Sequence, residues 1–246
     1  MNIRSRLTLT MPYLIMPTGR AAPPPQPTLP AVGVDLPEPI PLRTSYAGPA
    51  GPRLLVVGGI GLLHVVVYFI VTRLTLLRPA DAFIDPRVGL DDRIPHLAWT
   101  WPAYWLPYAL VPIAAVASIG RLDARAFRRL IVAWAGMILA GGVIQVVWPA
   151  VAPWPVAPAL TQRLYHDSAL ILPYATLPSM HVAHVAMAAI VTATVFPSFA
   201  VRVSGVLSTL LVAVATLTLK EHLVLDAVSG LALAIATGLW WRRGLR

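Results

Sequence analysis

Six apolar runs, separated by short polar segments, constrain the fold of this chain more than any other feature of its sequence. The runs are residues 54–77, 97–119, 130–148, 182–199, 203–219 and 223–241. A helix needs about 20 mostly apolar residues to cross the hydrocarbon core of a bilayer, where its backbone polar groups must bond to one another. The runs therefore predict an all-α fold, a polytopic membrane helix bundle with six transmembrane helices.

The composition excludes several other classes of protein. Only 12% of the 246 residues are charged and 57% are hydrophobic, whereas about 25% of the residues of an average soluble domain are charged. The formal net charge of +9 could suggest a nucleic-acid partner, but the arginines lie between the apolar runs and not in one basic stripe. Because cysteine is absent, a thiol nucleophile, a disulfide framework and a cysteine-ligated metal are excluded. The expected partner is a lipid bilayer and no nucleic acid.

The first 53 residues differ in character from the rest of the chain. Prolines crowd residues 21–27 and recur as far as Pro49, which gives the segment polyproline character and no apolar period that could pack. We predict that residues 1–53 form a disordered, proline-rich cytoplasmic arm. Residues 54–246 are then one six-span membrane domain.

The basic residues predict the orientation of the spans. With six spans, most of the nineteen lysines and arginines fall on one side of the membrane. They are Arg4, Arg6, Arg20, Arg43 and Arg53 in the arm, Arg121, Arg125, Arg128 and Arg129 between the second and third spans, Arg202, and Arg242, Arg243 and Arg246 at the end. Since basic residues concentrate on the cytoplasmic side, both termini are expected to be cytoplasmic, in a multi-pass protein of the cell (plasma) membrane.

Two histidines begin helices on the opposite, extracytoplasmic face. His181 follows the long proline-rich loop 149–178, and His222 ends the very short loop before the sixth span. Helix starts attract anions through their free N–H groups and the helix dipole. Ser179 is placed either to cap the fourth span or to donate its hydroxyl to an anion. An extracytoplasmic site at these two helix starts is therefore predicted.

His222 and Asp226 are four residues apart, so their side chains share one helix face. A carboxylate there can accept a hydrogen bond from one ring nitrogen and leave the other nitrogen as a nucleophile or base. Asp226 lies within an apolar run, where an ionisable group is costly and is by default a functional candidate. Lys220, the sole lysine of the chain, stands two residues before His222.

Here the sequence resembles a family. Pro178-Ser179-Met180-His181 and His222-x-x-x-Asp226 resemble the second and third signatures of the type 2 phosphatidic acid phosphatase superfamily. The finer pattern in residues 91–95, 177–183 and 219–230 is similar to its inositolphosphotransferase-like (inositol phosphorylceramide synthase-like) branch. The resemblance covers roughly residues 91–230.

The resemblance implies a phosphohistidine mechanism that needs no metal or other cofactor. His222 would attack the phosphorus of a lipid phosphate, Asp226 would hold the imidazole of His222, and His181 would protonate the leaving oxygen. Water or an alcohol would then accept the phosphoryl group, which makes the protein a lipid phosphatase or phosphotransferase. Basic side chains and helix-start N–H groups would stabilise the charge on the phosphate oxygens.

The chain departs from the family pattern in its basic residues. The first signature, a lysine followed at fixed spacing by Arg-Pro, is not found. Pro153-Trp154-Pro155 stands where the related branch tends to have Pro-Arg-Pro, and Ala215-Thr216 replaces the Ser-Arg that opens the third signature. The groups predicted to bind the substrate phosphate instead are Ser179, Lys220, Arg163 and Arg93.

Three other interpretations stay open. His181, His222 and Asp226 could form a purely structural network between helices. Together with His184 and Glu221 they could bind zinc in a metal-dependent membrane hydrolase, although no His-Glu-x-x-His spacing is present. The chain could also be a non-catalytic lipid-binding or transporter-like protein. Separately, His184 is expected to serve packing, and Asp91, Asp92 and Arg93 serve either loop solvation or headgroup contact.

Overall fold

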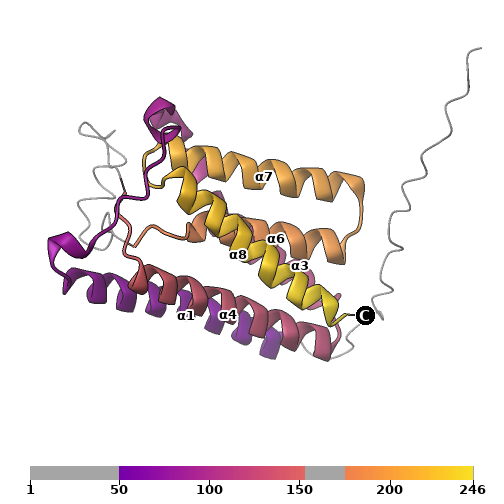
Figure 1. The fold of residues 1–246 in the computed structure, drawn as a ribbon. Coiled ribbons are helices and arrows are strands. Elements are labelled where there is room, and N and C mark those ends of the chain that lie inside the picture. The colour runs from indigo at the N-terminus through magenta and orange to yellow at the C-terminus, as the bar shows by residue number, and fades with distance from the viewer. Residues whose placement is uncertain (1–49, 153–174, 246) are drawn as a thin grey trace, which may run out of the picture. The chain divides into compact units, whose positions relative to one another are not determined.

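In the computed structural model, residues 50–152 and 175–245 are described, and they fold into helices (Figure 1). The helices are α1 (Gly51–Leu76), α2 (Trp101–Tyr104), α3 (Leu106–Ile119), α4 (Ala124–Val147), α6 (Met180–Val195), α7 (Phe199–Thr218) and α8 (Val224–Arg243). Short 3-10 turns cover Ala80–Ala82, Asp91–Arg93 and Ala98–Thr100. Within these residues β-type pairing is limited to one isolated bridge, between Ile84 and Ala150. The predicted all-α fold is confirmed.

Five of these helical segments are long and apolar enough to cross a membrane: α1, Ala98–Ile119, α4, α7 and α8. The fourth predicted span is shorter than expected, because α6 has 16 residues and is about 24 Å long at 1.5 Å per residue. The hydrocarbon core of a bilayer is about 30 Å thick. Multi-pass membrane character therefore agrees with the sequence analysis, while the count of six spans and the cytoplasmic termini stay predictions.

The second apolar run is not one continuous helix. The chain forms α2, turns at Trp105 and continues as α3. Pro102 and Pro107 each stand in the first turn of a helix, where the missing N–H of proline costs nothing. A proline is favourable in the first turn of a helix and unfavourable in its interior. Pro107 therefore favours the start of a new helix after Trp105 over the continuation of α2.

Two helices, α4 and α7, begin earlier than the apolar runs predict, because polar residues cap their first turns. Asp123 accepts a hydrogen bond from the Ala126 amide at 2.7 Å and begins α4 well before residue 130. Arg125, which was expected in a loop, therefore lies in the first turn of this helix. Ser198 caps α7 in the same way as Asp123 caps α4. Cap hydrogen bonds satisfy free helix N–H groups, so they set helix starts independently of hydrophobicity.

Arg53, predicted to belong to the arm, is part of α1. Its guanidinium is buried, donates from Nη1 to the carbonyls of Ile119 and Leu122 at 2.6 Å each, and lies over the ring of Phe127. These contacts attach the start of α1 to the turn before α4. Gly51 and Pro52 of the predicted arm also belong to α1, and residues 1–49 lie outside the described residues.

Helix α6 is the most enclosed element, because it packs against α3, α7 and α8. Figure 1 shows α6 and α8 starting at the same end of the bundle, with α7 running back from the far end of α6. The core is built from small and apolar side chains such as Ala183, Met187 and Val191. The exterior is also apolar, with Leu55 of α1 79% exposed, as expected of a surface that faces lipid.

Candidate active site

The two histidines at the starts of α6 and α8 lie together, as the sequence predicted. The ring centroids of His181 and His222 are 5.7 Å apart. A backbone hydrogen bond of 2.9 Å from the Ser179 amide to the Asp226 carbonyl ties the two helix starts to each other. The site is therefore held by main-chain contact and does not depend on side-chain packing alone.

His222 and Asp226 form a buried pair. Asp226 Oδ2 lies 3.4 Å from His222 Nδ1, and the side chains of His222 and Asp226 are 9% and 0% exposed. The same oxygen accepts the Leu223 amide at 2.9 Å, which fixes the carboxylate at the start of α8. Asp226 Oδ1 and His222 Nδ1 are both buried without a hydrogen-bond partner among the described residues, so the 3.4 Å contact is an ion-pair distance and not a hydrogen bond. This geometry directs Asp226 at Nδ1 of the ring and leaves Nε2 for chemistry.

Ser179 begins α6, and the structure shows it in the capping role. Its Oγ accepts the Val182 amide at 3.5 Å, and the residue is fully buried. Gly230 packs against its backbone, because a Cβ added to Gly230 would overlap the carbonyl oxygen of Ser179. Only glycine allows the two helix starts to approach so closely.

We therefore expect Gly230→Ala to destabilise the protein by about 1–3 kcal/mol, the usual cost of overpacking a core. The measurement is unfolding of the purified protein in detergent, together with amide exchange at Ser179. Gly136→Ala is the matched control, since a Cβ there meets nothing within 4 Å. Equal stability of the two variants would contradict the close contact.

An aromatic wall borders His181, and the sequence analysis missed it. The ring of Tyr104 lies 4.3 Å from the His181 ring, centroid to centroid. Tyr108 Oη lies 3.5 Å from His181 Nε2. Trp101 stacks on Tyr104 at 5.4 Å. The available signal was the recurrence of aromatic residues three and four positions apart, which places them on one helix face.

The three basic residues predicted to bind phosphate differ in their surroundings. Lys220 donates from Nζ to the carbonyls of Asp91 and Ile94 at 2.9 and 2.6 Å, so two of its three N–H donors are engaged. Arg93 is exposed on the 3-10 turn Asp91–Arg93. Arg163 lies outside the described residues. Phosphate binding by these three residues, and by Ser179, stays a prediction.

His184 is separate from the site. Its Nδ1 lies 2.8 Å from the Met180 carbonyl, and its ring contacts those of His64 and Trp134. These contacts agree with the packing role expected for it. Among the residues described, no three histidine, aspartate or glutamate side chains gather closely enough to hold a metal ion.

Comparison with known proteins bears on the whole arrangement. The family model of the PAP2 superfamily matches residues 94–240, which include both histidines, Asp226 and most of the helices. No curated protein and no solved structure matches the chain. The matched segment is more than half of the 246 residues, and membership suggests a phosphatase-type hydrolase. The chain belongs to the PAP2 superfamily.

Proposed function

We propose that the protein is an integral-membrane lipid phosphatase or phosphotransferase that works through a phosphohistidine on His222. The observation that carries the proposal is the buried His222–Asp226 pair at the start of α8, with His181 beside it. A carboxylate held at Nδ1 makes Nε2 the basic nitrogen of the ring. The exposed apolar surface of the helices supports a substrate that approaches from the bilayer.

The chemistry divides into two steps. In the first, the lone pair of His222 Nε2 forms a bond to phosphorus, the bond to the lipid oxygen breaks, and His181 gives its proton to that oxygen. In the second, water or an alcohol attacks the phosphorus and gives its proton to His181, and the bond from phosphorus to His222 breaks. Asp226 stabilises the positive charge that develops on the His222 ring in the first step.

The phosphate charge needs positive groups near the two helix starts. The proposed groups are Ser179, Lys220, Arg93 and Arg163, together with the helix-start N–H donors of α6 and α8 that no cap engages. The amides of Val182 and Val224 are not among them, because they donate to Ser179 and Asp91. The positive-inside distribution of arginines supports an extracytoplasmic position for this site, in a multi-pass protein of the cell membrane. Transfer to an alcohol or headgroup acceptor beside hydrolysis is proposed from the resemblance of residues 177–183 and 219–230 to the inositolphosphotransferase-like branch; the family match itself supports the superfamily and not this branch.

A panel of lipid phosphates tests the function. Purified protein in lipid nanodiscs is incubated with phosphatidic acid, a lysolipid phosphate, a polyprenyl phosphate and a phosphoinositol-bearing lipid, with and without alcohol acceptors. Release of inorganic phosphate identifies a phosphatase, and a new phosphodiester or phosphomonoester of the acceptor identifies a transferase. Binding of these lipids without any product would identify a non-catalytic lipid-binding protein and contradict the proposal.

We expect turnover to be insensitive to chelators. Every proton and phosphoryl transfer above uses a histidine, an aspartate or a basic side chain, so none requires a Lewis acid. The measurement is the initial rate after treatment with EDTA and with a zinc-selective chelator, compared with untreated protein. Loss of turnover that is restored by zinc or magnesium would favour the metal-dependent hydrolase instead.

A further inference from the structure

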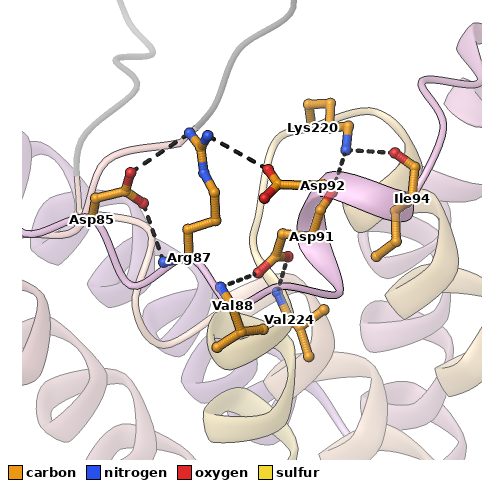
Figure 2. Close-up of polar contacts among 8 residues, drawn as sticks. All are labelled: Asp85, Arg87, Val88, Asp91, Asp92, Ile94, Lys220 and Val224. Carbon is orange, nitrogen blue, oxygen red and sulfur yellow. Dashed lines mark hydrogen bonds and ion pairs between the residues drawn. The ribbon is translucent and has the colours of Figure 1, made fainter.

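We propose that Asp91 and Lys220 form a clasp that positions His222 for attack, an inference that rests on the proposed function. The clasp is the set of hydrogen bonds that join the loop before α2 to the turn between α7 and α8. Figure 2 shows these contacts, with Asp91 lying between Lys220 and Val224. Both residues act on His222 through the backbone, so this inference makes both positioning residues; for Lys220 the role is separate from the phosphate contact proposed above, for which only its third N–H is left.

Asp91 is unlike its neighbour Asp92. Asp91 is 4% exposed, and its two oxygens accept different backbone amides: Oδ1 accepts from Val224 and Oδ2 from Val88, both at 2.8 Å. Val224 is the first residue of α8. Asp91 therefore caps α8 from a loop distant in sequence, where a carboxylate also complements the helix dipole. Asp92 is exposed, and the structure shows its carboxylate in an ion pair with Arg87 at 3.7 Å.

Lys220 holds the first residue of the segment 220–224, whose last residue is held by the carboxylate of Asp91. Its Nζ donates to the carbonyl of Asp91 at 2.9 Å and to that of Ile94 at 2.6 Å. Its backbone has a φ of 61°, a left-handed conformation that side chains other than glycine adopt only when their surroundings hold it. The two carbonyl bonds supply that hold, and the turn directs the chain from α7 into α8.

His222 stands midway between these two attachments. The main-chain carbonyl of Asp91 holds position 220, and its carboxylate holds position 224. The amide of His222 donates to the Thr216 carbonyl at 3.2 Å, which joins the turn to α7. A single loop residue thus fixes both ends of the segment that carries the nucleophile, and a displacement of about 1 Å can lower a rate about 10²-fold.

A second attachment lies alongside the clasp. The Leu97 amide donates to the Thr218 carbonyl at 2.9 Å, and the hydroxyls of Thr100 and Thr218 are 2.9 Å apart. These bonds keep the loop beside the end of α7 when the clasp is removed. Variants of Asp91 and Lys220 are therefore expected to keep the overall fold and to lose the local position of His222.

The first experiment measures position without activity. Hydrogen–deuterium exchange is followed for residues 219–226 in purified wild-type protein, Asp91→Ala, Lys220→Ala and the matched control Asp92→Ala, which removes the same charge one residue away. We expect faster exchange in the first two variants and wild-type exchange in the control. If Asp91→Ala does not fold, Asp91→Asn takes its place in the experiment. It keeps the side-chain volume and one acceptor, so we expect an exchange rate between those of the wild type and Lys220→Ala. Unchanged exchange in Asp91→Asn and Lys220→Ala overturns the clasp.

The second experiment separates a positioning role from phosphate binding by Lys220. With the lipid phosphate that the wild type hydrolyses, we expect Asp91→Ala and Lys220→Ala each to lower kcat about 10²-fold with little change in KM. The double variant should be no more than a few-fold slower than the worse single variant, because both changes release one segment. A Lys220→Ala variant with normal kcat, raised KM and weaker inhibition by inorganic phosphate overturns the positioning role and favours direct phosphate contact.

The two proposals fail in different ways. If wild-type protein releases no phosphate and transfers none, the proposed function is wrong, while amide exchange still decides whether the clasp holds the turn. If wild-type protein is active and exchange accelerates in Asp91→Ala without any fall in kcat, the function stands and the positioning role is wrong.

Discussion

Replacing His222 with alanine is expected to abolish turnover, with a loss of kcat on the order of 10⁶-fold, as when the nucleophile is removed from another covalent enzyme. Among the described residues, the two side chains beside His222 are not placed to replace its Nε2, because His181 is proposed to donate a proton and Asp226 lies at Nδ1. The measurement is rapid quench in alkaline detergent with ³²P-labelled lipid phosphate, followed by detection of phosphoprotein that is stable to base and labile to acid. Wild type should accumulate label and His222→Ala should not.

Two controls make this result specific. His64→Ala removes a histidine that contacts His184 in the membrane domain, so it should leave the label unchanged. Asp226→Asn should keep the fold and lower the rate of labelling by about 10²–10⁴, because the amide no longer selects the tautomer of His222. Turnover near that of the wild type in folded His222→Ala would contradict the mechanism.

His181→Ala is expected to have the second-largest effect, and the effect should depend on the leaving group. An alkoxide is a poor leaving group that needs a proton in the transition state, so loss of the acid should cost about 10²–10⁴ in kcat for a lipid alkyl phosphate. In an aryl phosphate made from an acidic phenol, the phenolate is a good leaving group and departs without protonation. Turnover of this aryl phosphate by His181→Ala should therefore stay within a few-fold of wild type.

The measurement is kcat/KM for a series of aryl and alkyl phosphates of increasing leaving-group pKa. Wild type should show a shallow dependence and His181→Ala a steep one, since only the wild type donates a proton. Tyr108→Phe serves as a control for the wall around His181, because it removes the hydroxyl 3.5 Å from Nε2 and leaves the ring. Equal slopes in wild type and His181→Ala would show that His181 is not the general acid.

The sequence alone determined the features that depend on near neighbours along the chain. Apolar runs specified the helices because a helix in lipid must be apolar over its whole length. The pairing of His222 with Asp226 was predicted from the four-residue repeat of a helix face, but α8 begins at Val224, so His222 lies just before the helix and the pair forms at the helix N-terminus. The juxtaposition of His181 and His222 was also expected, because a six-span topology would place the starts of the fourth and sixth spans on one side of the membrane.

Only the tertiary structure decided contacts between segments far apart in the chain. Nothing in residues 91–94 shows which aspartate is buried, yet Asp91 caps α8 from 133 positions away and Asp92 stays exposed. The sequence places Arg53 in a disordered arm, whereas its guanidinium bonds to the carbonyl of Ile119 at the end of α3 and to that of Leu122 in the turn before α4. Those carbonyls lie 66 and 69 positions further along the chain, so no pattern local to Arg53 could have indicated them.

The dependence of long-range contacts on helix packing also explains the other differences between the sequence predictions and the structure. Local spacing sets which side chains share a helix face, but the partner of that face depends on how the helices pack. Tyr104 and Tyr108 lie against His181 because α3 packs against α6 and α2 packs against α7. Lys220 was predicted from its charge to bind phosphate, and only the packed turn shows its Nζ bonded to two carbonyls. The sequence therefore determined the helices and the His222–Asp226 pair, while the packing of distant segments decided what holds that pair in place.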